Sequence, residues 1–167
     1  MRHSLLPLLL LALSAAFGCD PMPPDPDGGM VDANVEPRLT LGAGEGRFAE
    51  FADNDTLPLV SGCQGSQHVW VALRAEGIER TGTIIELELL RAGDMTSVSQ
   101  TFRVRISFRD VGASYVELTG LTLIVEDPDE ALGEALIMRA TITDRNDVEL
   151  TDERPIRIEF DPDGGCG

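Results

Sequence analysis

Apolar and polar side chains alternate strictly in several segments of this chain. From Phe102 to Arg109 every even-numbered residue is apolar and every odd-numbered residue is polar, and the run from Thr83 to Leu90 has a similar period. Successive side chains of a strand point to opposite faces, so this period is typical of strands with one buried face. No segment of useful length shows the period of an amphipathic helix. These patterns predict an all-β fold.

The two alternating runs are joined by the turn-like segment Ala92–Ser97, which predicts an antiparallel hairpin. We expect Leu87 to lie opposite Val104, because this register sets apolar residues against apolar residues. It also sets Glu86 against Arg105. A slip by one residue would bury the charges, so the pattern specifies the face that each residue takes.

Further strands are predicted where short apolar or alternating runs lie between turn signals. They cover residues 39–41 or 47–52, then 68–74, 115–126, 136–143 and 156–160. In the segment 115–126 the alternation changes parity at Gly120, which indicates a bulge or a bend between sheets. About seven short strands separated by turns predict an antiparallel β-sandwich, with immunoglobulin-like or fibronectin type III-like topology as the leading choice.

The segment Ala140–Asp144, the polar turn after it and Ile156–Ile158 resemble the last hairpin of many bacterial immunoglobulin-like domains. The resemblance implies the two-layer fold of those domains. We therefore expect one immunoglobulin-like β-sandwich domain over residues 38–167.

The N-terminus has the pattern of an export signal. Arg2 and His3 are followed by an apolar run from Leu5 to Phe17. A helix of that length is about 20 Å long, which is too short for the roughly 30 Å hydrocarbon core of a bilayer. The pattern predicts a signal peptide over residues 1–18, and no later run is apolar enough to span a membrane.

The end of this run, Ala16–Cys19, resembles the lipobox of bacterial lipoproteins. The resemblance implies cleavage before Cys19, acylation of that cysteine by palmitate and related chains, and attachment to a membrane. The alternative is ordinary secretion after cleavage at a small residue such as Gly18, which would leave a thiol on Cys19.

Residues 19–37 are rich in Pro, Gly and acidic residues and contain no basic residue. This composition predicts a disordered tether after the lipidated cysteine. Asp20 resembles the inner-membrane retention signal of some Gram-negative lipoproteins, but that rule varies between bacterial groups. We expect a lipid-anchored protein of the cell envelope and favour the outer membrane or the cell surface over the inner membrane.

The chain has three cysteines. In an exported protein, lipidation of Cys19 leaves Cys63 and Cys166 as a candidate disulfide pair. If the strands from His68 onward run strictly up and down, these two cysteines lie at the same pole of the domain.

Charge excludes several classes of function. The chain has 13 Lys+Arg against 29 Asp+Glu, a formal net charge of −16, and every basic residue is arginine. Such a charge repels nucleic acid, so we expect no nucleic-acid partner. The absence of lysine also excludes Schiff-base and lysine-nucleophile chemistry.

The most distinctive segment is Gly62–Arg74. It resembles a Gly-x-Gln-Gly-Gly-x-His turn that leads into an aromatic strand in uncharacterised bacterial lipoproteins. One interpretation is a tight glycine-rich turn with a structural role only. The other is a small ligand-binding site formed by Gln64, Gln67 and His68.

The residues present favour a non-enzymatic protein without a cofactor. His68 is the one histidine outside the predicted signal peptide, and no Gly-x-Ser-x-Gly motif occurs. The residues needed for a nucleophilic catalytic triad are therefore not recognisable in the sequence. We expect no metal site, although acidic loops at 53–55, 127–129 and 144–147 could supply oxygen ligands for calcium.

The leading prediction is a membrane-anchored extracytoplasmic lipoprotein that acts as a binding or structural module of the cell envelope. Its partners would be the membrane, through the N-terminal lipid, and an envelope protein or glycan. Two alternatives stay open: a calcium-stabilised adhesion domain, and a periplasmic copper- or zinc-handling protein that would use His68.

Overall fold

The computed structural model describes residues 35–112 and 114–165. The predicted signal peptide, Cys19 and most of the predicted tether lie outside the described residues, as does Cys166. The elements are β1 (Arg38–Ala43), β2 (Thr56–Ser61), β3 (Gln67–Glu76), β4 (Thr83–Arg91), β5 (Phe102–Ile106), β6 (Arg109–Asp110), β7 (Val116–Val125), α1 (Pro128–Ala131), β8 (Leu136–Thr143) and β9 (Glu149–Gly165). Within the described ranges, no helix is long and apolar enough to cross a membrane.

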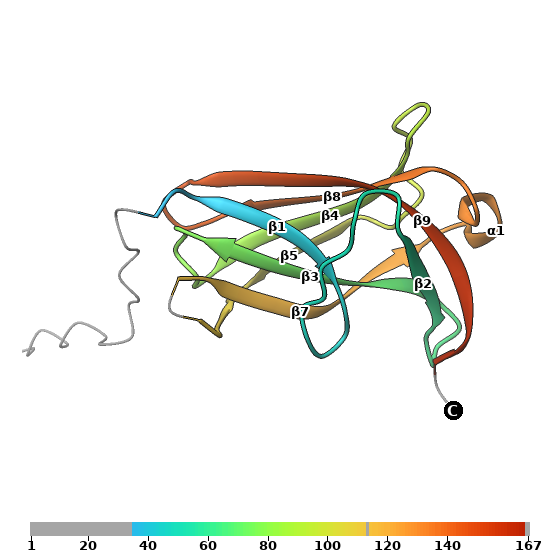
Figure 1. Ribbon diagram of the computed structural model, residues 1–167, viewed down its shortest axis with the longest axis horizontal. Coiled ribbons are helices and arrows are strands. Elements are labelled where there is room, and N and C mark those ends of the chain that lie inside the picture. Colours follow the sequence, from blue (N-terminus) through green and yellow to red (C-terminus); the bar gives the residue numbers. More distant parts are fainter. Residues whose placement is uncertain (1–34, 113, 166–167) are drawn as a thin grey trace, which may run out of the picture.

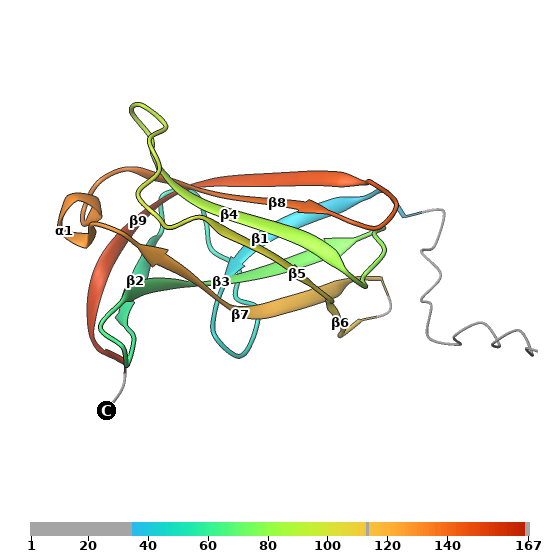
Figure 2. The ribbon, with the colours of Figure 1, turned by 180° about the vertical axis from the view of Figure 1, so that it is seen from behind.

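The strands form two layers that share the long strand β9 (Figure 1). Residues 149–156 of β9 pair antiparallel with β8, in the layer that continues to β4 and β5. Residues 157–165 pair parallel with β2, in the layer that continues to β3, β7 and β6. β1 also pairs with β3. The view from behind shows β4, β5 and β8 together and β6 beside β7 (Figure 2).

The prediction of an all-β sandwich is confirmed, with one parallel pair, β2 and β9, in an otherwise antiparallel arrangement. The apolar residues of the run 83–90 lie between the layers. Ile85, Leu87 and Leu89 of β4 belong to the buried core, as predicted. Val71 and Leu73 of β3 face them from the other layer and are fully buried. The run 102–109 is not one half-buried strand as predicted: β5 ends at Ile106, which is 36% exposed, and Arg109 pairs with β7 in the other layer.

The predicted register of the β4–β5 hairpin is wrong by two residues. Leu87 lies opposite Phe102, and Val104 lies opposite Ile85. Glu86 accordingly pairs with Arg103 and not with Arg105. A shift by two residues keeps every side chain on its face, so alternation alone cannot detect it.

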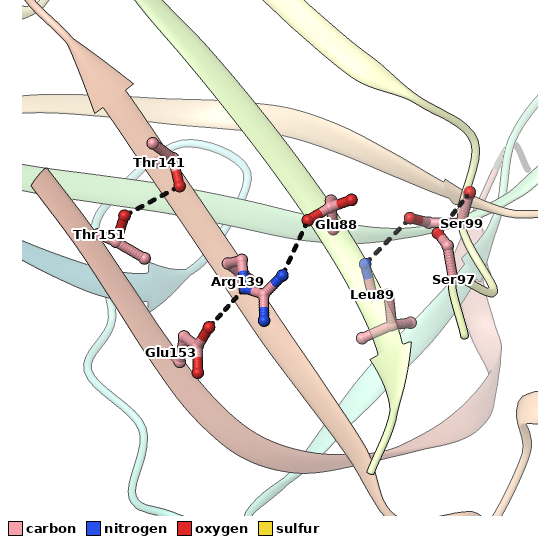
Figure 3. Close-up of polar contacts among 8 residues, drawn as sticks. All are labelled: Glu88, Leu89, Ser97, Ser99, Arg139, Thr141, Thr151 and Glu153. Atoms are coloured by element: carbon pink, nitrogen blue, oxygen red, sulfur yellow. Dashed lines mark hydrogen bonds and ion pairs between the residues drawn. The ribbon is translucent and has the colours of Figure 1, made fainter. Parts of the chain in front are cut away.

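The shift arises from the segment 97–100. This segment first bonds to β4 and then turns to β7 before β5 begins. The Leu89 N–H donates to the Ser99 hydroxyl at 3.0 Å, and the Ser97 hydroxyl donates to the Ser99 carbonyl at 3.1 Å (Figure 3). The Gln100 N–H then donates to the Ile124 carbonyl of β7 at 2.9 Å. The segment thus links the two layers on the side away from β9.

Cross-strand pairs on the exposed face hold the order β4–β8–β9. Arg139 of β8 lies between Glu88 of β4, at 3.3 Å, and Glu153 of β9 (Figure 3). The Thr141 and Thr151 hydroxyls are 3.0 Å apart. Each such pair contributes about 0.2–1 kcal/mol, so these contacts specify pairing more than they stabilise the fold.

The parity change at Gly120 is a β-bulge, as predicted. Val71 lies opposite Leu121 but Leu73 lies opposite Leu118, so β7 carries one extra residue. Gly120 has a φ of +74°, and a Cβ there would lie 2.8 Å from the Glu45 carbonyl oxygen. Glycine is therefore required both for the backbone conformation and for the close approach of the loop between β1 and β2.

Two parts of the strand pattern differ from the prediction. Of the two alternatives near the start, 39–41 lies within β1, whereas Ala49 forms only an isolated bridge with Ala43. Strand β2 was not predicted, and it contains Pro58, which lacks an N–H and is unfavourable inside a sheet. The structure accommodates Pro58 because β2 pairs with β3 only at Val60 and Ser61, so no N–H of residue 58 is needed on that side.

Candidate functional site

The outer face of β3 carries side chains that water does not reach. Because Val69, Val71 and Leu73 face the core, His68 and Trp70 lie on the opposite face of the same strand. That face of a sandwich layer usually contacts solvent. His68 is nevertheless only 6% exposed, so other segments cover it.

A cavity of about 570 Å³ lies on this face, where β2 leads into β3. Its volume falls in the range of small-ligand sites, about 300–1,000 Å³. The residues that line it come from the loop after β1, from β2, from the turn after β2, from β3 and from the end of β9. They are Glu45, Pro58, Val60, Ser61, Gly62, Cys63, His68, Trp70, Asp161 and Gly164. We call it the His68 pocket.

Three local structures bring these residues together. The turn after β2 is closed by the Gly62 N–H, which donates to the Ser66 carbonyl at 2.7 Å, and by the Gly65 N–H, which donates to the Gly62 carbonyl at 2.9 Å. The parallel pairing of β2 with β9 places Asp161 beside this turn. The loop that carries Glu45 rests on the bulge at Gly120, whose N–H donates to the Gly44 carbonyl at 3.2 Å.

A cation–π cluster holds the same loop against the sheet. The Arg74 guanidinium lies 4.3 Å from the centre of the Phe48 ring and 4.4 Å from that of Tyr115. It also donates two hydrogen bonds to Glu117, at 2.9 and 2.7 Å. Phe48 belongs to the loop and lies directly over Gly42, where no larger residue would fit. Arg74 therefore fastens the Glu45 loop to the outer face of β3.

The pocket is lined by both apolar and acidic residues. Pro58, Val60 and Trp70 supply the apolar surface, while Glu45 and Asp161 supply carboxylates from two different elements. No arginine lines it among the described residues. Within the same ranges, neither carboxylate is in an ion pair.

His68 has a ring nitrogen whose hydrogen-bonding capacity is not satisfied by the described residues. Its Nε2 atom is buried and has no hydrogen-bond partner among the described residues. The ring packs edge-on against Trp70, with ring centres 4.6 Å apart and an interplanar angle of 87°. Burial lowers the pKa of His68, and the nearby negative charge of Glu45 opposes this effect only in part. The imidazole is therefore neutral at neutral pH.

The residues predicted as a ligand site do not converge. His68 lines the pocket, whereas Gln67 borders a separate cavity with Gln100 on the opposite side of β3. Strand alternation is the reason, since neighbouring residues point to opposite faces. Gln64 is an exposed residue of the turn. The tight turn itself is confirmed, while ligand contact by these residues stays a prediction.

The sequence did not single out Glu45 or Asp161, and it gave Trp70 no role in a site. Glu45 lies in an irregular loop, and Asp161 lies in an acidic segment that resembles an ordinary turn. Nothing in their local sequence distinguishes them from the many other acidic residues. Only the pairing of distant segments places them on one pocket.

The candidate disulfide lies at the rim of the same pocket. Cys63 lines the pocket, and Ser61 pairs with Gly165, the residue before Cys166. The parallel pairing of β2 with β9 carries the chain towards Cys63, which differs from the strictly up-and-down path that we expected. Cys166 lies outside the described residues, so the disulfide stays a prediction.

The acidic loops are used for structure. Asp144 is 5% exposed and accepts hydrogen bonds from the N–H groups of Glu79, Asn146 and Val148, at 2.8, 2.7 and 2.9 Å. Asp53 lies 3.3 Å from Arg154. Over residues 35–112 and 114–165, no group of three or more His, Cys, Asp or Glu residues is placed to hold a metal ion.

No protein-family model matches the chain, and no curated protein sequence matches it either.

Proposed function

We propose that this protein is a membrane-anchored extracytoplasmic lipoprotein whose β-sandwich is a non-enzymatic binding module, with the His68 pocket as its ligand site. The observation that carries the proposal is a buried imidazole that lines a pocket of ligand size and whose Nε2 has no hydrogen-bond partner among the described residues. A buried polar atom without a hydrogen bond costs about 1–3 kcal/mol, so such an atom beside a cavity indicates a ligand that would satisfy it.

The contacts in the pocket favour binding over catalysis. Ser61 and His68 line the same cavity, but His68 Nε2 forms no hydrogen bond with a described residue. A serine nucleophile needs a base within about 2.6–3.2 Å. The described part of the pocket therefore lacks an activated nucleophile.

The anchor is proposed from the sequence. The apolar leader ends at Cys19, and the acidic Pro/Gly-rich segment that follows would separate the domain from the bilayer. The partner of the domain would then be an envelope protein or glycan within reach of the membrane.

Metabolic labelling with radioactive palmitate tests the anchor. We expect label in the wild-type chain produced in an export-competent bacterium and no label in Cys19→Ser. The same substitution should release the domain from membranes in a carbonate wash. Absence of label from the wild-type chain would contradict the anchor.

Site-specific photo-crosslinking in intact cells tests the binding site. A photoreactive residue at position 58 lies in the His68 pocket, whereas the same residue at position 129 lies on the exposed surface of α1 and serves as the control. We expect a product that forms from position 58 only and that is lost in His68→Ala. Equal products from both positions, or none from position 58, would contradict the pocket as the binding site.

A further inference from the structure

We infer that the His68 pocket selects a cationic group on an apolar stem, an alkylammonium or a guanidinium. This inference rests on the proposed binding function and names the chemistry of its ligand.

The charges around the pocket are the first argument. Glu45 and Asp161 reach it from two elements, and neither carboxylate has a described arginine as a counterion. Arg74, further along the outer face of β3, is already neutralised by Glu117. The two carboxylates would repel an anion in the pocket, whereas each of them would attract a cation.

The apolar residues are the second argument. Val60 and Pro58 can cover the methylene groups of an aliphatic stem, as they line the cavity beside the carboxylates. Trp70 is half-buried, packs at 87° to the His68 ring and lines the cavity. Among aromatic side chains, the indole ring binds cations best. The pocket therefore offers apolar side chains to the stem of the ligand, and carboxylates and an indole ring to its cationic group.

His68 is the third and independent argument. Only 6% of the residue is exposed, it lines the pocket, and its Nε2 has no hydrogen-bond partner in the described structure. A neutral imidazole nitrogen can accept a hydrogen bond from an ammonium or guanidinium N–H. Nε2 is itself screened from solvent, so a cation whose N–H displaces the side chains that cover it would satisfy this atom, which has no described partner.

The fluorescence of Trp70 provides a direct test, because the chain has a single tryptophan. The full chain in detergent micelles is titrated with n-butylammonium, n-butanol and butyrate at constant ionic strength. We expect a saturable change in emission with butylammonium, at least tenfold weaker binding of butanol, and no response to butyrate. Equal binding of butylammonium and butanol, or binding of butyrate, would overturn the inference.

A matched pair of double variants tests the role of the carboxylates. Glu45→Gln with Asp161→Asn removes two charges at the pocket, and Asp129→Asn with Glu130→Gln removes two charges on α1. We expect about tenfold weaker binding of butylammonium in the first pair only, a change of about 1.4 kcal/mol. Equal losses in both pairs would show that net charge alone attracts the probe and would overturn the inference. Circular dichroism and the thermal midpoint establish that both pairs fold.

Two sources could present this chemistry, a free amine or a Lys or Arg side chain of a polypeptide. Acetyl-Gly-Lys-Gly-amide that binds more tightly than butylammonium assigns the site to a polypeptide side chain, and weaker binding assigns it to a free amine. If no amine changes the Trp70 emission while position 58 still captures a specific product in cells, the cationic specificity is wrong and the binding function stands. If both experiments fail, the proposed function fails with it.

Discussion

At the scale of single residues, two buried polar groups have opposite roles. The Asp144 carboxylate accepts three backbone N–H groups, two in the turn between β8 and β9 and one from Glu79 in the connection between β3 and β4. His68 is buried to a similar degree and lines a cavity, but its Nε2 has no hydrogen-bond partner in the described part of the chain. Burial of a polar group with all its partners indicates a structural role, whereas burial without them beside a pocket indicates a site.

Replacing Asp144 tests the structural role. Asp144→Ala leaves three N–H groups without their acceptor, so we expect the free energy of unfolding to fall by about 3 kcal/mol. Asp127→Ala is the matched control, because Asp127 is exposed and its side chain forms no cap hydrogen bond. Urea denaturation of both variants measures the difference. A loss below about 1 kcal/mol in Asp144→Ala would contradict the role assigned to these bonds.

The titration of His68 predicts how stability depends on pH. Because burial lowers the pKa of His68 in the folded chain, the unfolded chain binds a proton there first as the pH falls. The contribution to stability is complete above the unfolded pKa of about 6.5 and is lost progressively as the pH falls below it. We expect His68→Gln to reduce the slope of the unfolding free energy between about pH 7.5 and 5.5. Identical slopes in the two proteins would show that His68 is not buried as a neutral group.

At the scale of secondary structure elements, the bulge in β7 connects a packing detail to the pocket. Alternation in the sequence revealed the bulge, since Leu118 and Leu121 both face the core although they differ in parity. The role of the bulge depends on the loop after β1, whose Glu45 carbonyl oxygen would lie only 2.8 Å from a Cβ on residue 120. The element thus positions a wall of the His68 pocket.

A substitution at the bulge tests this connection. Gly120→Ala places a side chain at a positive φ and pushes the Glu45 carbonyl away, so we expect a loss of about 2 kcal/mol in stability and a shifted Trp70 emission. Gly46→Ala lies in the same loop with no atom within 4 Å of the added Cβ, and it should leave both properties unchanged. If the two variants behave alike, the loop does not depend on the bulge.

At the scale of the whole molecule, β9 closes the sandwich. Its first half completes one layer and its second half completes the other, which brings Gly164 at the end of β9 beside the turn at Cys63. A disulfide between Cys63 and Cys166 would lock this closure. It would join two segments that about 100 residues of chain separate, so the chain-entropy model assigns it up to roughly 4–5 kcal/mol.

Reduction of the purified protein tests the disulfide. We expect dithiothreitol to lower the free energy of unfolding by up to about 4 kcal/mol in the wild-type chain. It should have no effect on the double variant Cys63→Ser with Cys166→Ser. Peptide mapping without reduction should recover the two cysteine peptides linked. Two separate peptides that both react with iodoacetamide would remove the disulfide from this account.

Local periodicity was enough to predict an all-β body, most of its strands, the inward face of the run 83–90 and the bulge at Gly120. These properties depend on neighbours in the chain, where the two-residue repeat of a strand is directly readable. The register of β4 against β5, the parallel pairing of β2 with β9 and the meeting of Glu45, His68 and Asp161 were not readable in this way. A shift by two residues leaves the same faces buried, and pairing between distant strands depends on which surfaces close the sandwich. The long-range packing of the folded chain therefore decides these features, and the candidate site is one of them.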